Sequence, residues 1–117
     1  MPNGNQIIPD GPFDGEILDI VLELDRYGNM VVFWNVRVMG GRYDGAMPPK
    51  QYHLKSPSAW ASLVREAGIL GIAIHDVREL EAKKGEFAGA RARFSAKTNQ
   101  DGFQVIRVVR PLPKTKL

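Results

Sequence analysis

"SPSAWASLVREAG", residues 56–68, decides the fold, because it is the clearest helix signal in a chain otherwise dominated by strand patterns. Ser56 is a favoured N-cap residue and Pro57 suits the first helical position. Apolar residues then follow at helical spacing, namely Trp60, Leu63, Val64 and Ala67. Gly68 favours a left-handed stop, so the sequence predicts a helix over 57–67.

A second, weaker helix signal follows in "IHDVRELEAKKG", residues 74–85. Asp76 and Glu79, three residues apart, have the spacing of a capping box, in which each residue hydrogen-bonds the backbone of the other. Gly85 is the expected end of this segment.

Strand patterns flank the helices on both sides. Alternating or β-branched runs precede them at 15–24, 30–39 and 50–54, and others follow at 87–97 and 103–110. The turn residues at 25–29 and "TNQDG" at 98–102 make hairpins of the first two strands and of the last two. Pro48 and Pro49 cannot donate ladder hydrogen bonds, so the third strand is expected to be bent or to lie at an edge.

Three strands, a helical insertion and two more strands form the element order of the OB-fold. We therefore predict an all-β protein, a five-stranded OB-fold-like Greek-key barrel with the helix between strands 3 and 4. A single domain is expected over 13–110, after a loose N-terminal lead-in (1–12) and before a basic C-terminal tail (111–117).

Composition and motifs exclude several kinds of chemistry. The 117 residues contain no cysteine, so thiolate catalysis and cysteine-ligated metals are excluded. No phosphate-binding loop or hydrolase motif is present, and the two histidines, His53 and His75, are expected to be ordinary polar residues. We predict no enzyme, no metal site and no cofactor. Without a signal peptide or a long apolar run, a cytoplasmic location is expected.

Positive charge is concentrated in the last third of the chain. From Lys84 onward there are eight Lys and Arg residues against two acids, a balance of +6. The first 83 residues carry eight such cations against eleven acids, a balance of −3. This asymmetry indicates a polyanionic partner.

The strand faces indicate where such a partner would bind. In the second strand Val32, Trp34, Val36 and Val38 are expected to face the core, which leaves Phe33 and Arg37 outward. In "ARARFSAK", residues 90–97, the small apolar residues share one face, and Arg91, Arg93 and Lys97 share the other. In the last strand we favour Ile106 and Val108 inward, which leaves Phe103, Val105 and Arg107 outward.

Cations that track phosphates and flat rings that stack on bases are the usual means of holding a single strand. The predicted nucleic-acid-binding surface holds Phe33, Arg37, Arg91, Arg93, Lys97, Phe103 and Arg107, and Tyr27 at a hairpin tip is placed to close over a ligand. These residues also have simpler possible roles. Cations on strands can protect sheet edges from aggregation. Phe33 belongs to the core if the face assignment is reversed, and Tyr27 can pack on its own turn.

The chain resembles the small OB-fold single-stranded DNA-binding proteins of phages and integrated elements. The resemblance spans roughly 13–110 and rests on "PFDGEI", "FWNVRVMGGRYDG", "SAWASLVREAGIL" and "GARARFSAKTNQDGFQVIRVV". It implies DNA binding in replication or recombination with little sequence preference, with DNA favoured over RNA. Many members end in an acidic tail that recruits partner enzymes, whereas this chain ends "PLPKTKL". A non-enzymatic structural or adaptor barrel is the alternative, and the sequence leaves a homo-oligomer open.

Overall fold

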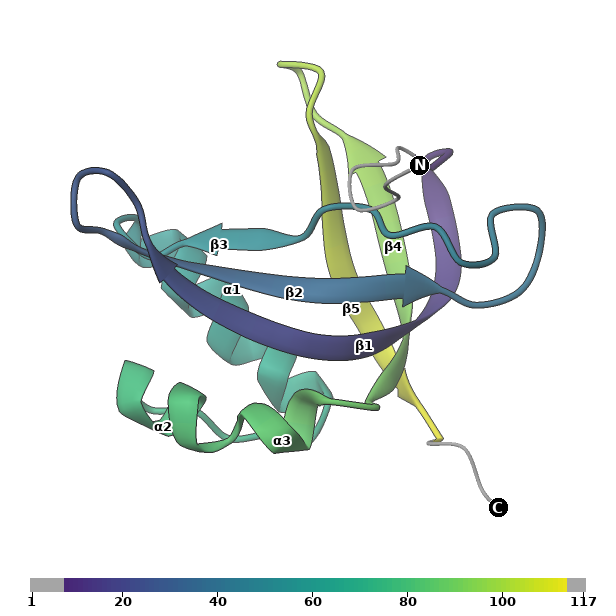
Figure 1. The fold of residues 1–117 in the computed structure, drawn as a ribbon. Coiled ribbons are helices and arrows are strands. Elements are labelled where there is room, and N and C mark those ends of the chain that lie inside the picture. The colour runs from purple at the N-terminus through teal and green to yellow at the C-terminus, as the bar shows by residue number, and fades with distance from the viewer. Residues whose placement is uncertain (1–7, 114–117) are drawn as a thin grey trace.

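The computed structural model describes residues 8–113 as one five-stranded antiparallel sheet with three short helices (Figure 1). The strands are β1 Gly11–Leu24, β2 Met30–Val38, β3 Gln51–His53, β4 Arg91–Thr98 and β5 Gln104–Leu112. The helices are α1 Pro57–Ile69, α2 Val77–Ala82 and α3 Lys84–Phe87. All three helices lie between β3 and β4 in the chain, so the predicted order of elements is confirmed.

The sheet has the strand order β3-β2-β1-β4-β5, with β1 at its centre. The first part of β1, Gly11–Glu16, pairs with β4, and the part from Gly15 to Leu24 pairs with β2. Figure 1 shows the resulting curvature: β1 starts beside β4 and bends round into its hairpin with β2. One long, bent strand therefore joins the two halves of the sheet.

A β-bulge in β1 breaks the alternation that the sequence suggests. Simple alternation places Leu18 on one face with Ile20 and Leu24, and places Ile17 on the other. The β1–β2 register shifts between Ile17 and Asp19, so Ile17 and Ile20 both face the core while Leu18 and Leu24 are exposed. An extra residue in one strand increases local twist and bend, which explains how β1 can pair with two neighbours.

Gly15 lies just before this bend and is buried, where both pairings of β1 overlap. A Cβ at this position would stand 3.0 Å from Cε2 of Phe94 and 3.1 Å from Cγ1 of Val36. The absence of a side chain therefore allows the Phe94 ring to pack directly on the β1 backbone.

We expect Gly15→Ala to lower the free energy of unfolding by about 1–3 kcal/mol, because the added methyl overpacks the core. Urea denaturation followed by circular dichroism measures the change. Gly68→Ala is the matched control, since a Cβ there meets nothing within 4 Å and the position is helical. That control should stabilise by up to about 1 kcal/mol. A neutral Gly15→Ala would show that the core yields at this point.

The predicted core faces of the later strands are confirmed. All four inward residues of β2, Val32, Trp34, Val36 and Val38, are buried, and so are Ile106 and Val108 of β5. The alternation in "ARARFSAK" is likewise confirmed, with Ala90, Ala92, Phe94 and Ala96 in the core. Trp60, predicted as core, is only partly buried and packs against the core from α1.

The helix ends differ from the prediction. Gly68 remains inside α1, which continues to Ile69, and the left-handed glycine is Gly71 at φ 84°. Ser56 does not cap the helix with its side chain, whose Oγ instead lies 2.8 Å from Oγ of Ser58. Gly85, expected to end the second segment, lies within α3.

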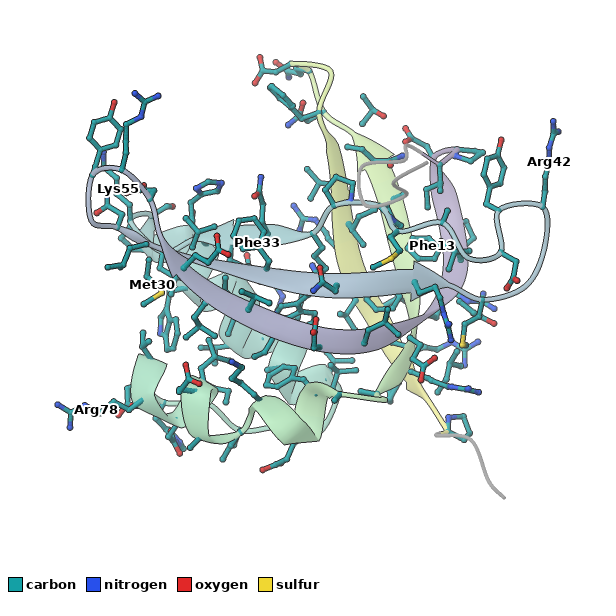
Figure 2. All side chains as sticks on the ribbon, in the orientation of Figure 1. Phe13, Met30, Phe33, Arg42, Lys55 and Arg78 are labelled. Carbon is teal, nitrogen blue, oxygen red and sulfur yellow. The ribbon has the colours of Figure 1, made fainter. Side chains whose placement is uncertain are left out.

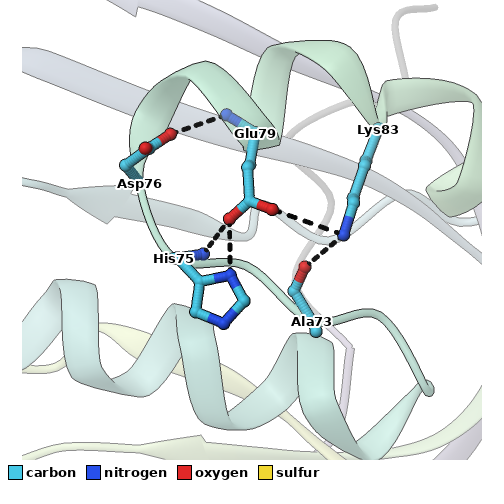
Figure 3. Close-up of polar contacts among 5 residues, drawn as sticks. All are labelled: Ala73, His75, Asp76, Glu79 and Lys83. Carbon is cyan, nitrogen blue, oxygen red and sulfur yellow. Dashed lines mark hydrogen bonds and ion pairs between the residues drawn. The ribbon is translucent and has the colours of Figure 1, made fainter.

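The capping box of α2 is confirmed in its first half (Figure 3). Asp76 Oδ1 accepts from the Glu79 N–H at 2.8 Å, but the Glu79 carboxylate reaches His75 instead of Asp76. Glu79 Oε1 accepts from the His75 N–H at 2.6 Å and lies 2.7 Å from Nδ1 of the same residue. These bonds, the backbone bond foremost, lower the pKa of Glu79.

The first and last strands extend into the segments predicted as lead-in and tail. Residues 11 and 12 of the predicted lead-in belong to β1, and Ile8 is buried in the core. Asp10 accepts hydrogen bonds from the N–H and the hydroxyl of Thr98, so this segment is tied to β4. Residues 111 and 112 of the predicted tail extend β5. The rest of the lead-in (1–7) and of the tail (114–117) lies outside the described residues.

β3 and β5 are the two edges of the sheet, and no ladder joins them within residues 8–113. The sheet is therefore not closed by backbone hydrogen bonds, in contrast to the closed barrel that the sequence predicts. The described helices are also too short or too polar to cross a membrane.

Candidate nucleic-acid interface

Side chains bridge the open side of the sheet, which we call the β3–β5 seam and define as the space between Lys50–His53 and Gln104–Val108. Lys50 Nζ donates to the Ile106 carbonyl at 2.5 Å and lies 2.7 Å from Oε1 of Glu66 on α1. The same oxygen accepts from the Tyr52 hydroxyl at 2.7 Å and from the Val108 N–H at 3.3 Å. A buried ion pair thus links β3, α1 and β5 where a ladder would otherwise run.

Burial governs the ionisation of this cluster. The Lys50 and Glu66 side chains are 3% and 4% exposed. Loss of hydration lowers the pKa of Lys50, and the Glu66 carboxylate opposes that shift. Burial and the same carboxylate raise the pKa of Tyr52. The Lys50 ammonium also lies 4.6 Å from the centre of the Tyr52 ring, so its protons face oxygen or aromatic partners.

This cluster was not predicted, although the sequence contains one signal for it. Glu66 lies next to Ala67 and three residues after Leu63, on the side of α1 that carries the apolar residues. A charged residue among the buried positions of an amphipathic helix indicates a buried partner. Nothing in the local sequence identifies that partner as Lys50.

Three cavities adjoin one another along the outer side of the seam, and together we call them the groove. The first, about 410 Å³, lies along β2 and 47–51 and is lined by residues that include Phe33, Asn35 and Gln51. The second, about 420 Å³, shares Pro49, Lys50 and Gln51 with the first and is also lined by His53 and Phe103. The third, about 340 Å³, shares Val105 with the second and includes Lys97 and Arg107.

The structure brings two of the three predicted aromatic residues to the groove. Phe33 is half-buried on the outer face of β2, and Figure 2 shows it on the side of the sheet facing away from α2 and α3. Phe103 is 70% exposed at the start of β5 and lines the second cavity. Tyr27, 77% exposed at the tip of the β1–β2 hairpin, lines none of the three cavities.

Three of the predicted cations lie beside carboxylates of β1. Arg37 Nη2 lies 2.8 Å from Glu16, and Arg93 Nε lies 2.5 Å from Asp14. Arg91 is the register partner of Glu16 on the other side of β1. The neighbouring strand β1 therefore supplies acids that "ARARFSAK" itself lacks, and Arg37 and Arg93 are each paired with one of its carboxylates.

The edge-protection alternative is wrong for Arg91 and Arg93, because β4 is an interior strand between β1 and β5. Ladder partners occupy both of its sides, so its cations guard no free edge.

Lys97 and Arg107 differ from the other predicted cations. Both are exposed, both line the third cavity, and neither takes part in an ion pair with another described residue. They are near neighbours on the outer face, since Lys97 pairs with Val105 and Arg107 pairs with Ser95. Of the five predicted cations, these two line the groove, and neither is held in an ion pair there by any of residues 8–113.

The groove also contains polar residues that were not predicted to bind a ligand, namely Asn35, Gln51 and His53. Their positions follow from register: Gln51 lies opposite Phe33, and His53 lies opposite Val31. The alternation of β2 could have identified Asn35, which has the same outward orientation as Phe33.

A fourth cavity, about 470 Å³, lies elsewhere, between the start of β1 and the connection that follows β2. It shares no lining residue with the groove, and the Asp14–Arg93 pair forms part of its wall. Among the described residues no group of three or more His, Asp or Glu side chains is placed to hold a metal ion.

Comparison of the chain with models of known protein families, with curated proteins and with solved structures gave no match.

Proposed function

We propose that this protein binds single-stranded DNA along the groove and acts in replication or recombination, in a phage or mobile-element setting. We further propose that the sheet is an OB-type barrel whose last contact, between β3 and β5, is made by the Lys50–Glu66 pair instead of a ladder. The element order, the shared strand β1 and the antiparallel pairing support this assignment. OB-folds bind oligonucleotides on this type of surface.

The observation that carries the proposal is the continuity of the groove. Aromatic rings line the first two cavities, and two cations that form no ion pair with a described residue line the third. This separation suits a single strand, because bases stack on rings while phosphates need nearby positive charge. Double-stranded DNA, whose bases are already stacked, would leave Phe33 and Phe103 without partners.

A fluorescence anisotropy titration with labelled oligo-dT against duplex DNA of the same length tests the proposal. We expect the single strand to bind at least tenfold more tightly, since loss of aromatic stacking costs about 1–3 kcal/mol per base. Equal affinity for the two forms, or no binding of either, would contradict it. The second outcome would favour the structural or adaptor alternative.

The salt dependence of oligo-dT binding tests which cations contact phosphate. With Lys97 and Arg107 as the contacts, the slope of log affinity against log salt should be about −1.4, at roughly −0.7 for each phosphate neutralised. Lys97→Ala combined with Arg107→Ala should abolish most of that slope. Arg37→Ala combined with Arg93→Ala is the matched control, because carboxylates already compensate both residues. A larger change of the slope in the control variant would indicate that the DNA binds along the β1–β4 face instead.

A further inference from the structure

We infer that the first cavity of the groove is a thymine-binding site, so that the protein prefers thymine over uracil and over cytosine in a single strand. This inference rests on the proposed function and adds a base preference to it. The arrangement of side chains around the outer face of β2 supports it.

The register of β2 and the following segment defines the walls of this cavity. Phe33 lies opposite Gln51 in the ladder. The Trp34 N–H donates to the Lys50 carbonyl at 3.0 Å and the Val38 N–H donates to the Ala46 carbonyl at 2.8 Å, so the same register continues beyond the ladder. Asn35 therefore lies opposite Pro49. Met47 lies opposite Arg37, the next outward residue of β2. A ring, two amides and two apolar side chains surround one space.

The Asn35 amide is held in one orientation. Its Nδ2 donates to Oδ1 of Asp19, its register partner on β1. An ionised carboxylate only accepts hydrogen bonds, so the amide nitrogen must be the atom that faces β1. The carbonyl oxygen of Asn35 is then left as a fixed acceptor for a group in the cavity.

A fixed acceptor distinguishes the bases by the ring nitrogen that they present. Thymine carries an N–H at N3, which can donate to the Asn35 oxygen, whereas N3 of cytosine is itself an acceptor and would face that oxygen unfavourably. The exposed Gln51 amide can donate to one of the two carbonyl oxygens beside N3 of thymine. Single-stranded bases are commonly read on this edge while they stack on an aromatic ring, here that of Phe33.

The apolar wall distinguishes thymine from uracil, which differs only by the absence of the C5 methyl. Met47 is half-buried and Pro49 is exposed, and both line the cavity beside Asn35. Apolar side chains are the usual contacts of the thymine methyl group. We therefore assign the methyl to the wall formed by Met47 and Pro49.

The test compares three labelled homopolymers of equal length, oligo-dT, oligo-dU and oligo-dC, in one buffer. We expect oligo-dT to bind about fourfold more tightly than oligo-dU, the ratio expected for burying one methyl group. The affinity for oligo-dC should be at least tenfold lower than that for oligo-dT, which is the usual effect of mismatched hydrogen-bonding groups on a base edge. Equal affinities of oligo-dT and oligo-dU would overturn the thymine site while leaving the proposed function intact. Failure of all three to bind would overturn the proposed function itself.

Two variants and one control locate the effect. Met47→Ala should bring the dT-to-dU ratio close to one while the affinity for oligo-dU is retained. Gln51→Ala, at an exposed position, should weaken oligo-dT by about fivefold or more. Met39→Ala is the control, since Met39 is also half-buried but lines the cavity at the start of β1 and not the groove. An unchanged ratio in Met47→Ala would remove the methyl contact from this wall. If that variant does not fold, the homopolymer series and Gln51→Ala still decide the question.

Discussion

Replacing Glu66 by Gln is expected to lower the free energy of unfolding by about 3–5 kcal/mol, the usual cost of removing one partner of a buried ion pair. Gln has nearly the same volume, so the loss comes from the Lys50 ammonium, which stays buried without its carboxylate. The same change also replaces the ionised acceptor of the Tyr52 hydroxyl and the Val108 N–H with a neutral amide. Urea denaturation at neutral pH measures the effect.

Glu81→Gln is the matched control for this experiment. Glu81 pairs with Lys84 at 3.4 Å, but their side chains are 61% and 41% exposed. Exposed pairs contribute about 0–1 kcal/mol, so the control should change stability little. If Glu66→Gln costs no more than Glu81→Gln, the buried pair does not hold the β3–β5 seam together.

The combination of Lys50→Met with Glu66→Leu separates the cost of an unpaired charge from the contribution of the pair. Apolar replacements of similar volume often match or exceed the stability of a buried ion pair. The double variant should therefore be more stable than Glu66→Gln. Its DNA affinity is a second readout, because Lys50 lines both the first and the second cavity.

Replacing Phe103 by Ala is expected to weaken oligo-dT binding by about 1–3 kcal/mol, or roughly 5-fold to 150-fold, through the loss of one stacking ring. Phe103 is largely exposed, so the free energy of unfolding should change by less than about 0.5 kcal/mol. The salt slope should be unchanged, because no cation is removed. Anisotropy titrations across a salt series measure both quantities.

Tyr27→Ala provides the comparison for Phe103→Ala. Tyr27 is as exposed as Phe103 but lies outside the groove, at the tip of the β1–β2 hairpin. We expect its replacement to leave oligo-dT affinity nearly unchanged. A loss as large as that of Phe103→Ala would extend the binding path to this hairpin and restore the role that the sequence analysis gave to Tyr27.

The alternation of apolar and polar residues correctly predicted which side chains of a regular strand face the core. The inward residues of β2, β4 and β5 follow from strict alternation, because side chains of a regular strand point to opposite faces with period two. Alternation failed in β1, where the bulge at Leu18 resets the period. A bulge adds one residue without a marked signature, so β1 could not be assigned correctly without its partner strands.

The sequence predicted several residues that line the candidate site, but it did not predict which of the cations are paired with acids. Phe33, Phe103, Lys97 and Arg107 line the groove, as their outward positions suggested. Arg37, Arg91 and Arg93 do not line it, and acids of β1 pair with Arg37 and Arg93 across the ladder. Compensation by a residue some 80 positions away cannot be counted within a local window of sequence.

The sequence by itself determined the strand and helix order, the core faces of three strands, the cap of α2 and the concentration of cations near β4 and β5. These features depend on neighbours within a few residues, where propensity and period act directly. Only the tertiary structure decided that the β3–β5 edge is bridged by Lys50 and Glu66, and that Asp14 pairs with Arg93 and Glu16 with Arg37. The first outcome depends on which charged side chains are buried together, and the second on which residues lie opposite each other in neighbouring strands. Both involve residues far apart in the sequence, which only folding brings together.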